Sequence, residues 1–179
     1  GMGIDVARFE KNDKTIAAVQ ALQREYFLSP QEFVMVCAAE FSDRKNQMFL
    51  VRAMQRLKQE GLPCRLILVG DGEFERTKSL AVQLSVRKEI RFPGYTRELA
   101  PYFYLADASV SASRIEGLPF QIMEAMACGL PVIASRVKGH EDLVEPDVNG
   151  LLFDFDDEGM FCQAVRRLYE DKKLREQMG

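Results

Sequence analysis

The fold is decided by Phe33-Val34-Met35-Val36-Cys37-Ala38-Ala39, a continuous apolar run without polar alternation. A strand of this kind is buried on both faces, which is typical of a parallel sheet covered by helices. Similar short segments recur along the chain, at Leu66–Gly70, Asp107–Ala112 and Pro131–Ala134, with a further short strand expected at Glu89–Phe92. We therefore expect these strands to lie in one parallel sheet.

Amphipathic helical patterns alternate with the apolar runs. One pattern begins at Leu50, repeats apolar residues at the i, i+3, i+4, i+7 spacing of a helix face, and is ended by Gly61 and Pro63. Further helices are expected at Lys14–Leu28, Glu73–Val86, Glu98–Ala106, Pro119–Cys128 and Glu158–Tyr169. Strands alternating with helices predict a Rossmann-like, three-layer α/β/α domain with a parallel sheet of about six strands. Ligands of such sheets bind at the carboxyl ends of the strands.

Size and composition narrow the function classes. The chain has 179 residues, of which 47% are hydrophobic and 28% charged, so it fits one soluble domain with a substantial core. Its net charge of -3 argues against nucleic acid as the main partner. The sequence has no signal peptide and no apolar run approaching the roughly 20 residues of a membrane span.

Cysteine and histidine usage argues against a metal site. Cys37, Cys64, Cys128 and Cys162 are far apart and lack metal-binding spacing, and His140 is the only imidazole. We interpret the cysteines as free thiols, mostly buried, in a reducing cytoplasm. We interpret His140 as a structural hydrogen-bonding residue rather than a general base.

The most informative motif is Glu116-Gly117-Leu118-Pro119-Phe120-Gln121-Ile122-Met123-Glu124, in which two carboxylates flank the start of a predicted helix. Backbone N–H groups at a helix start lack partners in the helix and, together with the helix dipole, attract an anion such as a phosphate. Glu124 can accept hydrogen bonds from ribose hydroxyls and Glu116 from those of a sugar. The motif fits a nucleotide sugar. On spacing alone, two solvated surface carboxylates fit equally well.

Three more loops follow predicted strands at the same edge of the sheet. Lys45, after the first strand, could reach the same anion from the other side. Gly72 permits close approach to the backbone, although the full G-x-G-x-x-G fingerprint is missing. Backbone groups around Thr96 could read the edge of a nucleobase. Each loop, taken alone, is equally explained as an ordinary surface loop.

Taken together and in this order, the loops resemble the C-terminal domain of the retaining GT-B glycosyltransferases, the glycosyltransferase group 1 family. The most specific element is the pair of glutamates separated by seven residues and fused to a Glu-Ala-Met-Ala-x-Gly-x-Pro-Val stretch. The matching segments run through most of the chain: Gly3–Asp5 with Phe9, Arg44–Asn46, Val69–Gly72, Phe92–Gly94, Ala106–Ala108, Ser113 with Glu116–Gly117, Glu124–Ala134 and Asn149–Leu152.

The resemblance implies a role for each matching residue. Lys45 would contact the diphosphate, Glu124 the ribose and Glu116 the donor sugar, with Lys45 and Glu116 acting at the reacting centre. Backbone amides from Gly117 to Phe120 would contact the sugar and phosphate, and the Thr96 region the base. The implied donor-binding set is Arg44, Lys45, Gly72, Thr96, Glu116, Gly117, Leu118, Pro119, Phe120 and Glu124. The nucleotide sugar is a substrate, and no cofactor or metal is expected.

The sequence departs from the family pattern at one position. Many members carry an arginine five residues before the lysine, where this chain has Glu40. Either the phosphate clamp has a single cation, or Arg44 or another residue replaces the missing one. This version of the loop is similar to members from bacterial capsule and exopolysaccharide pathways. The departure also supports an alternative class, a non-catalytic sugar-nucleotide-binding or interaction module. An epimerase of GT-B type and a nicotinamide dehydrogenase fit the motifs less well.

The resemblance also sets expectations for the whole protein. Residues 1–179 would form a single donor-binding domain, with residues 1–30 as an interdomain turn and leading helix. The N-terminal, acceptor-binding domain would be absent from this chain and would be its partner in the full-length protein, a hexosyltransferase of polysaccharide or glycolipid biosynthesis. The chain alone is expected to transfer nothing. We expect a cytoplasmic location, with peripheral association at the inner face of the membrane through the missing half where acceptors are lipid-linked.

Overall fold

The apolar runs form a six-stranded sheet in the order β3-β2-β1-β4-β5-β6. The computed structural model describes residues 4–179, so the turn expected at residues 1–5 lies largely outside the described residues. Every neighbouring pair of strands is parallel. The strands are β1 Phe33–Ala38, β2 Cys64–Val69, β3 Ile90–Gly94, β4 Ala108–Ser111, β5 Val132–Ser135 and β6 Gly150–Phe153. The predicted parallel sheet of about six strands is confirmed.

Strand β1 is apolar throughout because both of its faces are covered. Phe33, Met35 and Cys37 belong to one hydrophobic cluster, which also contains buried residues of α2 and α7. Val34 and Val36, which alternate with them, belong to a second cluster with buried residues of α4 and α5. Successive side chains of a strand point to opposite faces, so a strand inside a three-layer domain must be apolar at every position.

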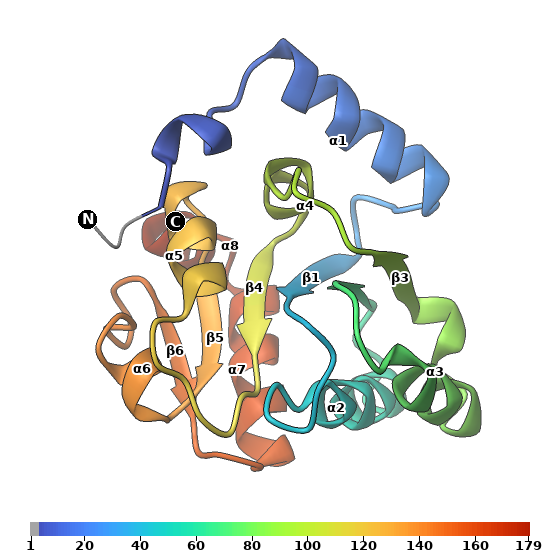
Figure 1. Cartoon of the computed structure of the whole chain (residues 1–179). Helices are drawn as coiled ribbons and strands as arrows, with labels where there is room; N and C mark the ends of the chain where they lie inside the picture. The colour runs from blue at the N-terminus through green and yellow to red at the C-terminus, as the bar shows by residue number, and fades with distance from the viewer. Residues whose placement is uncertain (1–3) are drawn as a thin grey trace.

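Helices cover both faces of the sheet (Figure 1), with α1, α4 and α5 on one side and α2, α3 and α7 on the other. The α-helices are α1 Asp13–Glu25, α2 Gln47–Gln59, α3 Phe74–Gln83, α4 Ala100–Leu105, α5 Phe120–Ala127, α6 Lys138–Glu141, α7 Glu158–Glu170 and α8 Lys172–Met178. Two short 3₁₀ helices, η1 Val6–Phe9 and η2 Arg87–Glu89, complete the elements. The three-layer α/β/α architecture is therefore confirmed.

Several helix boundaries differ from the sequence-based expectation. Helix α1 ends at Glu25 rather than near Leu28, because Phe27 has a left-handed backbone with φ of 53°. Helix α3 ends at Gln83, and Ser85 beyond it has φ of 60°. Pro119 is the residue before the first turn of α5 and not part of the helix.

The carboxyl ends of β1 and β2 come very close together at Gly70. A Cβ atom at this residue would lie 2.1 Å from the carbonyl oxygen of Ala39, and its φ of +146° is one that other residues rarely adopt. The Gly70 N–H donates to the carbonyl of Gly94, which ends β3. Glycine at position 70 thus lets the loops after three strands meet at one edge of the sheet.

The four cysteines are free, and three of them, Cys37, Cys64 and Cys162, are buried. Burial raises the pKa of each of these three thiols to about 12 and that of Cys128 to about 11. The thiols are therefore protonated and unreactive near neutral pH. Among residues 4–179, no helix combines the length and the apolarity needed to cross a bilayer.

Candidate functional site

A cleft of about 510 Å³ opens at the carboxyl end of the sheet. Its walls come from the loop after β1, the loop after β4, the first turns of α5, and α6. The residues that line it include Arg44, Lys45, Glu116, Gly117, Leu118, Pro119, Phe120, Gln121, Glu124 and His140. The structure thus brings together eight of the ten predicted site residues, from segments far apart in the sequence.

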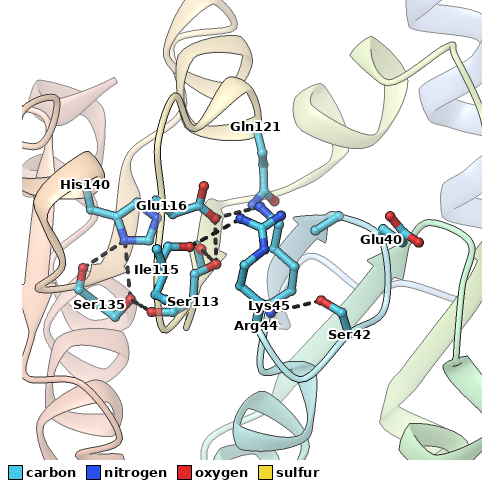
Figure 2. Close-up of polar contacts among 12 residues, drawn as sticks. Glu40, Ser42, Arg44, Lys45, Ser113, Ile115, Glu116, Gln121, Ser135 and His140 are labelled. Atoms are coloured by element: carbon cyan, nitrogen blue, oxygen red, sulfur yellow. Dashed lines mark hydrogen bonds and ion pairs between the residues drawn. The ribbon is translucent and has the colours of Figure 1, made fainter.

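Lys45 and Glu116 form an ion pair inside this cleft (Figure 2). The Nζ atom of Lys45 lies 2.6 Å from Oε1 of Glu116, and the Ser113 hydroxyl donates to the same oxygen at 2.7 Å. The Glu116 side chain is only 4% exposed. Burial opposes its ionisation, but hydrogen bonds from Lys45 and Ser113 outweigh burial and hold the pKa of Glu116 below its ordinary value. Glu116 is therefore a carboxylate. Its second oxygen, Oε2, accepts no hydrogen bond from residues 4–179 and is available to a ligand.

The start of α5 forms the opposite wall. Within the described residues, the N–H groups of Leu118, Gln121 and Ile122 have no acceptor, since the first bond of the helix runs from Met123 to Pro119. The Gln121 side chain accepts a hydrogen bond from the backbone N–H of Ala38 at the end of β1. This contact fixes the helix start against the sheet, where unpaired donors and the helix dipole favour an anion.

Glu124 lies one turn further along α5 and is half-buried. Burial raises its pKa, and the positive charge of Arg8 opposes that rise only in part. Its carboxylate accordingly has a weaker acidity than Glu116, although both residues line the same cleft. In the sequence the two glutamates flank the start of α5, and in the structure both belong to the lining of this cleft.

Two contacts hold the loops that carry these groups. Asn46, with a left-handed φ of 57°, donates through its side chain to the carbonyl of Ala112 at 3.1 Å. The N–H of Arg114 donates to the carbonyl of Arg44 at 2.9 Å. These bonds join the loop after β1 to the loop after β4 and so fix Lys45 opposite Glu116.

Helix α6 supports Glu116 from behind. A Cβ atom at Gly139 would lie 2.7 Å from the carbonyl oxygen of Glu116 and 2.8 Å from its Cβ atom. The next residue, His140, is fully buried, and its Nδ1 atom lies 2.8 Å from the carbonyl oxygen of Ser135. Burial lowers the pKa of His140, so the ring is neutral. The hydrogen bond to the protein that the sequence analysis expects of His140 is present at Nδ1.

A second depression, of about 560 Å³, adjoins the cleft. It contains the remaining two predicted residues, Gly72 and Thr96, and shares Ala38, Ala39 and Glu40 with the cleft. Because they share these three residues, the two hollows adjoin each other along the carboxyl edge of the sheet.

Glu40 is exposed at the junction of the two hollows. Its Cγ atom would lie 3.0 Å from a Cβ atom at Gly72, and Figure 2 shows its carboxylate on the side away from Glu116. Arg44 lies on the cleft side and donates to the carbonyl of Ile115 at 3.4 Å. The positive side chains at the cleft are therefore Lys45 and Arg44, with an acidic group where the family pattern has an arginine.

Sequence reasoning assigned no role to three residues that build the site. Ser113 bonds Glu116, Gln121 bonds the end of β1, and Gly139 makes room for Glu116. Gln121 could have been found from its place in the first turn of the predicted helix. The other two roles depend on contacts that no local spacing indicates.

The arrangement can hold an anion between the Lys45 ammonium and the start of α5. Carboxylates on both sides of that position can accept hydrogen bonds from hydroxyl groups. The adjoining depression offers room for a flat ring. A diphosphate with a sugar at each end matches this order of groups.

The chain is similar to known glycosyltransferases. The family model of glycosyl transferases group 1 matches residues 32–171. EpsD of Bacillus subtilis, whose name describes it as a glycosyltransferase, is 30% identical over all of this chain and 47% of its own length. The UDP-Gal:alpha-D-GlcNAc-diphosphoundecaprenol alpha-1,3-galactosyltransferase of Escherichia coli is 27% identical over 82% of this chain and 39% of its own.

The fold also matches a solved structure. The Anabaena protein Alr3699/HepE, crystallised with UDP-glucose, has a TM-score of 0.87 and 22% identity, over 98% of this chain and 48% of that protein. This likeness shows a common fold, that of the GT-B glycosyltransferases. The chain spans about half the length of the curated relatives that it matches.

Proposed function

Because the chain belongs to the family of group 1 glycosyl transferases, we propose that it is the donor-binding half of a retaining glycosyltransferase. Its ligand is a nucleoside-diphosphate sugar. The observation that carries the proposal is the convergence of Lys45, the free start of α5, Glu116 and Glu124 on one cleft. These groups come from separate segments and match the successive parts of such a ligand in order.

Each part of the ligand has a partner with suitable chemistry. The diphosphate lies between Lys45 and the start of α5, with Arg44 as the second cation in place of the arginine that Glu40 replaces. Glu124 accepts hydrogen bonds from the ribose, and Glu116 from the transferred sugar. The base occupies the depression that contains Gly72 and Thr96. Of these contacts, those to the phosphates are the strongest because both partners are charged.

The same groups serve the reaction of the full-length protein. The bond between the anomeric carbon and the phosphate oxygen breaks, and the nucleoside diphosphate leaves with the electron pair. A fixed ammonium and an oriented helix start stabilise the charge that develops on the leaving oxygen. The acceptor hydroxyl attacks the same face of the sugar, which retains the anomeric configuration, and passes its proton to the departing phosphate oxygen. The acceptor site belongs to the part of the protein that this chain lacks.

We propose a biosynthetic setting at the cytoplasmic side of the membrane. Support comes from relatives whose names refer to lipopolysaccharide core biosynthesis, to colanic acid biosynthesis or to a diphosphoundecaprenol-linked acceptor. Those acceptors would be presented to the N-terminal half, so this chain would meet the membrane only through its partner domain. The transferred group is a hexose or a derivative of one.

Titration calorimetry with UDP, GDP and ADP tests the proposal. At least one nucleoside diphosphate should bind, and Lys45→Ala and Glu124→Ala should each weaken its affinity by about tenfold, the loss of one charge-assisted contact. Lys173→Ala and Glu176→Ala are the matched controls, because they remove the same charges from exposed positions on α8. Binding that is unchanged by both cleft substitutions would disprove the assignment of this cleft.

A non-catalytic module remains the second candidate, favoured by Glu40 alone. If the chain is a module that only mediates interactions, the wild-type chain should bind no nucleotide, whereas a non-catalytic sugar-nucleotide-binding module would still bind one. The interaction class also predicts that Glu40→Arg, which restores the family pattern, creates binding where none existed. Under the donor-site proposal the wild-type chain already binds, so the same calorimetric series separates it from the interaction class.

A further inference from the structure

The Nε2 atom of His140 is a buried polar atom without a hydrogen-bond partner among residues 4–179. The ring is fully buried, yet it lines the floor of the cleft that contains Glu116. Buried polar atoms of folded proteins are nearly always hydrogen-bonded, so an unpaired one in a cleft wall indicates a partner that arrives with the ligand.

The bonding of Nδ1 fixes what Nε2 can do. Nδ1 lies 2.8 Å from the carbonyl oxygen of Ser135, and a carbonyl only accepts. Nδ1 therefore carries the proton of the neutral ring, and Nε2 presents a lone pair. The missing partner must be a hydrogen-bond donor. A phosphate oxygen does not fit, because it is also an acceptor, whereas a sugar hydroxyl does.

Glu116 is a close neighbour of His140, near enough for its charge to act on the pKa of the ring. The backbone of Gly139, immediately before His140, packs against the backbone and Cβ atom of Glu116 without room for a side chain. Lys45 and Ser113 both bond Oε1 of Glu116. A diphosphate would bond the remaining N–H donors of Lys45 and bring its sugar to the floor of the cleft beneath the carboxylate.

We propose that Nε2 of His140 accepts a hydrogen bond from one hydroxyl of the transferred sugar, next to the hydroxyl bound by Glu116. The inference rests on the proposed function and names a residue that selects among donor sugars. Two acceptors side by side require two hydroxyl protons. The wall accordingly favours sugars with free hydroxyls at both positions and disfavours deoxy or alkylated ones.

The test measures the contribution of the sugar separately from that of the nucleotide. Calorimetry gives the dissociation constants of UDP and UDP-glucose, and of GDP and GDP-mannose, and the pair that the wild-type chain binds is carried forward. The ratio of the dissociation constants of the nucleotide sugar and the nucleoside diphosphate is then compared between wild type and variants. The extra negative charge of the free diphosphate affects this ratio equally in every variant and so cancels from the comparison.

Two substitutions test the two ring nitrogens of His140 separately. His140→Asn keeps an N–H donor at the position of Nδ1, and so the bond to Ser135, but removes the acceptor at Nε2. His140→Gln places a polar atom near Nε2 instead. We expect His140→Asn to weaken binding of the nucleotide sugar about fivefold relative to the nucleoside diphosphate, which is the effect of losing one hydrogen bond. The dissociation constant of the nucleoside diphosphate itself should not change. His140→Gln should retain most of the contribution.

Binding of monodeoxy analogues of the nucleotide sugar can be measured with the wild-type chain, so this part of the test does not depend on a variant that folds. One deoxy position should weaken binding about fivefold, and that penalty should vanish in His140→Asn. Equal losses for nucleotide and nucleotide sugar in His140→Asn, or no sensitive hydroxyl in the wild type, would overturn the inference alone. Failure of the wild-type chain to bind any nucleoside diphosphate would instead remove the proposed function on which it rests.

Discussion

Lys45 and Glu116 are 71 positions apart in the sequence and 2.6 Å apart in the structure. The pair keeps a largely buried carboxylate ionised and an ammonium oriented before any ligand arrives. Because Lys45 has three N–H donors and spends one on Glu116, it can bond a phosphate without abandoning the pair completely. Charges held in place in this way need no rearrangement as the leaving group develops its charge.

The two glutamates of the cleft differ in acidity, which gives donor binding a pH dependence. Glu124 has a raised pKa because burial outweighs the nearby charge of Arg8. It therefore protonates at a higher pH than Glu116 and then loses acceptor capacity toward the ribose. We expect affinity for UDP-glucose to fall as the pH drops from about 7 to about 5. Glu116 stays ionised in this range, since its pKa is lowered.

Calorimetry at several pH values measures this effect. A nucleotide sugar is the right probe because its phosphates bind no proton near neutral pH. Glu124→Gln should bind more weakly at pH 7 and show a flat profile, since glutamine does not titrate. Burial raises the pKa of the Cys128 thiol near Glu124 to about 11, so this thiol stays neutral over the range. A Glu124→Gln profile as steep as that of wild type would contradict the assignment.

At the scale of single residues, the sequence was informative about chemistry and uninformative about contacts. The positions of Lys45, Glu116 and Glu124 could be predicted because their motif is specific. The bond between Lys45 and Glu116, and that between Ser113 and Glu116, could not, because each depends on how loops from different strands meet.

The site depends on where helix α5 begins and on where helix α6 lies. Helix α5 starts at Phe120, just after the loop that carries Glu116, so its free N–H groups face the cleft. Helix α6 has only four residues, Lys138–Glu141, and its role is to press Gly139 and His140 against the loop. A short helix of this kind contributes position rather than stability of its own.

Substitution of Gly139 tests the packing of α6 against the site. Gly139→Ala would insert a Cβ atom at 2.7 Å from the carbonyl oxygen of Glu116. We expect it to lower the free energy of unfolding by about 1–3 kcal/mol, the usual effect of overpacking, and to weaken donor binding by shifting Glu116. Urea denaturation measures the first effect and calorimetry the second.

Gly117→Ala is the matched control for stability, since a Cβ atom there has nothing within 4 Å. Its free energy of unfolding should stay within about 0.5 kcal/mol of wild type. If Gly139→Ala proves as harmless as Gly117→Ala, α6 does not support Glu116 as described.

Helices and strands could be predicted where the residue pattern of the segment itself determines them. The apolar run of β1 and the spaced apolar residues of α2 lie where the sequence indicates. The end of α1 was wrong because Phe27 adopts a left-handed backbone that its residue type does not predict. Helix α6 was not predicted, since four residues give no periodicity and Gly139 is explained only by Glu116 behind it.

At the scale of the molecule, the sheet order and the cleft follow from the repeated strand-helix pattern. The order β3-β2-β1-β4-β5-β6 brings β1 and β4 together at the centre, and the loops after these two strands carry Lys45 and Glu116. From β1 the sheet extends to β2 and β3 on one side, and from β4 it extends to β5 and β6 on the other. Ligands of a doubly wound sheet usually bind at the point where the strand order changes direction in this way.

This chain should bind donor without transferring sugar. It spans about half the length of its relatives, and in the proposed function the acceptor site and part of the wall around the reacting sugar lie in the other half. An assay with radiolabelled UDP-glucose and GDP-mannose should detect no transfer to oligosaccharide or lipid-linked acceptors by residues 1–179. Measurable transfer by this chain alone would refute the division of roles between the two halves.

The most direct test of the central claim is a crystal structure of the chain with the nucleoside diphosphate that it binds most tightly. We predict phosphate oxygens within hydrogen-bonding distance of Lys45 Nζ and of the N–H groups at the start of α5, and ribose hydroxyls on Glu124. A separate polar hollow of about 220 Å³ is lined by Arg52, Arg76 and Arg114 on the other side of the Lys45 loop. Phosphates bound in that hollow, with the cleft between Glu116 and Glu124 empty, would contradict the account.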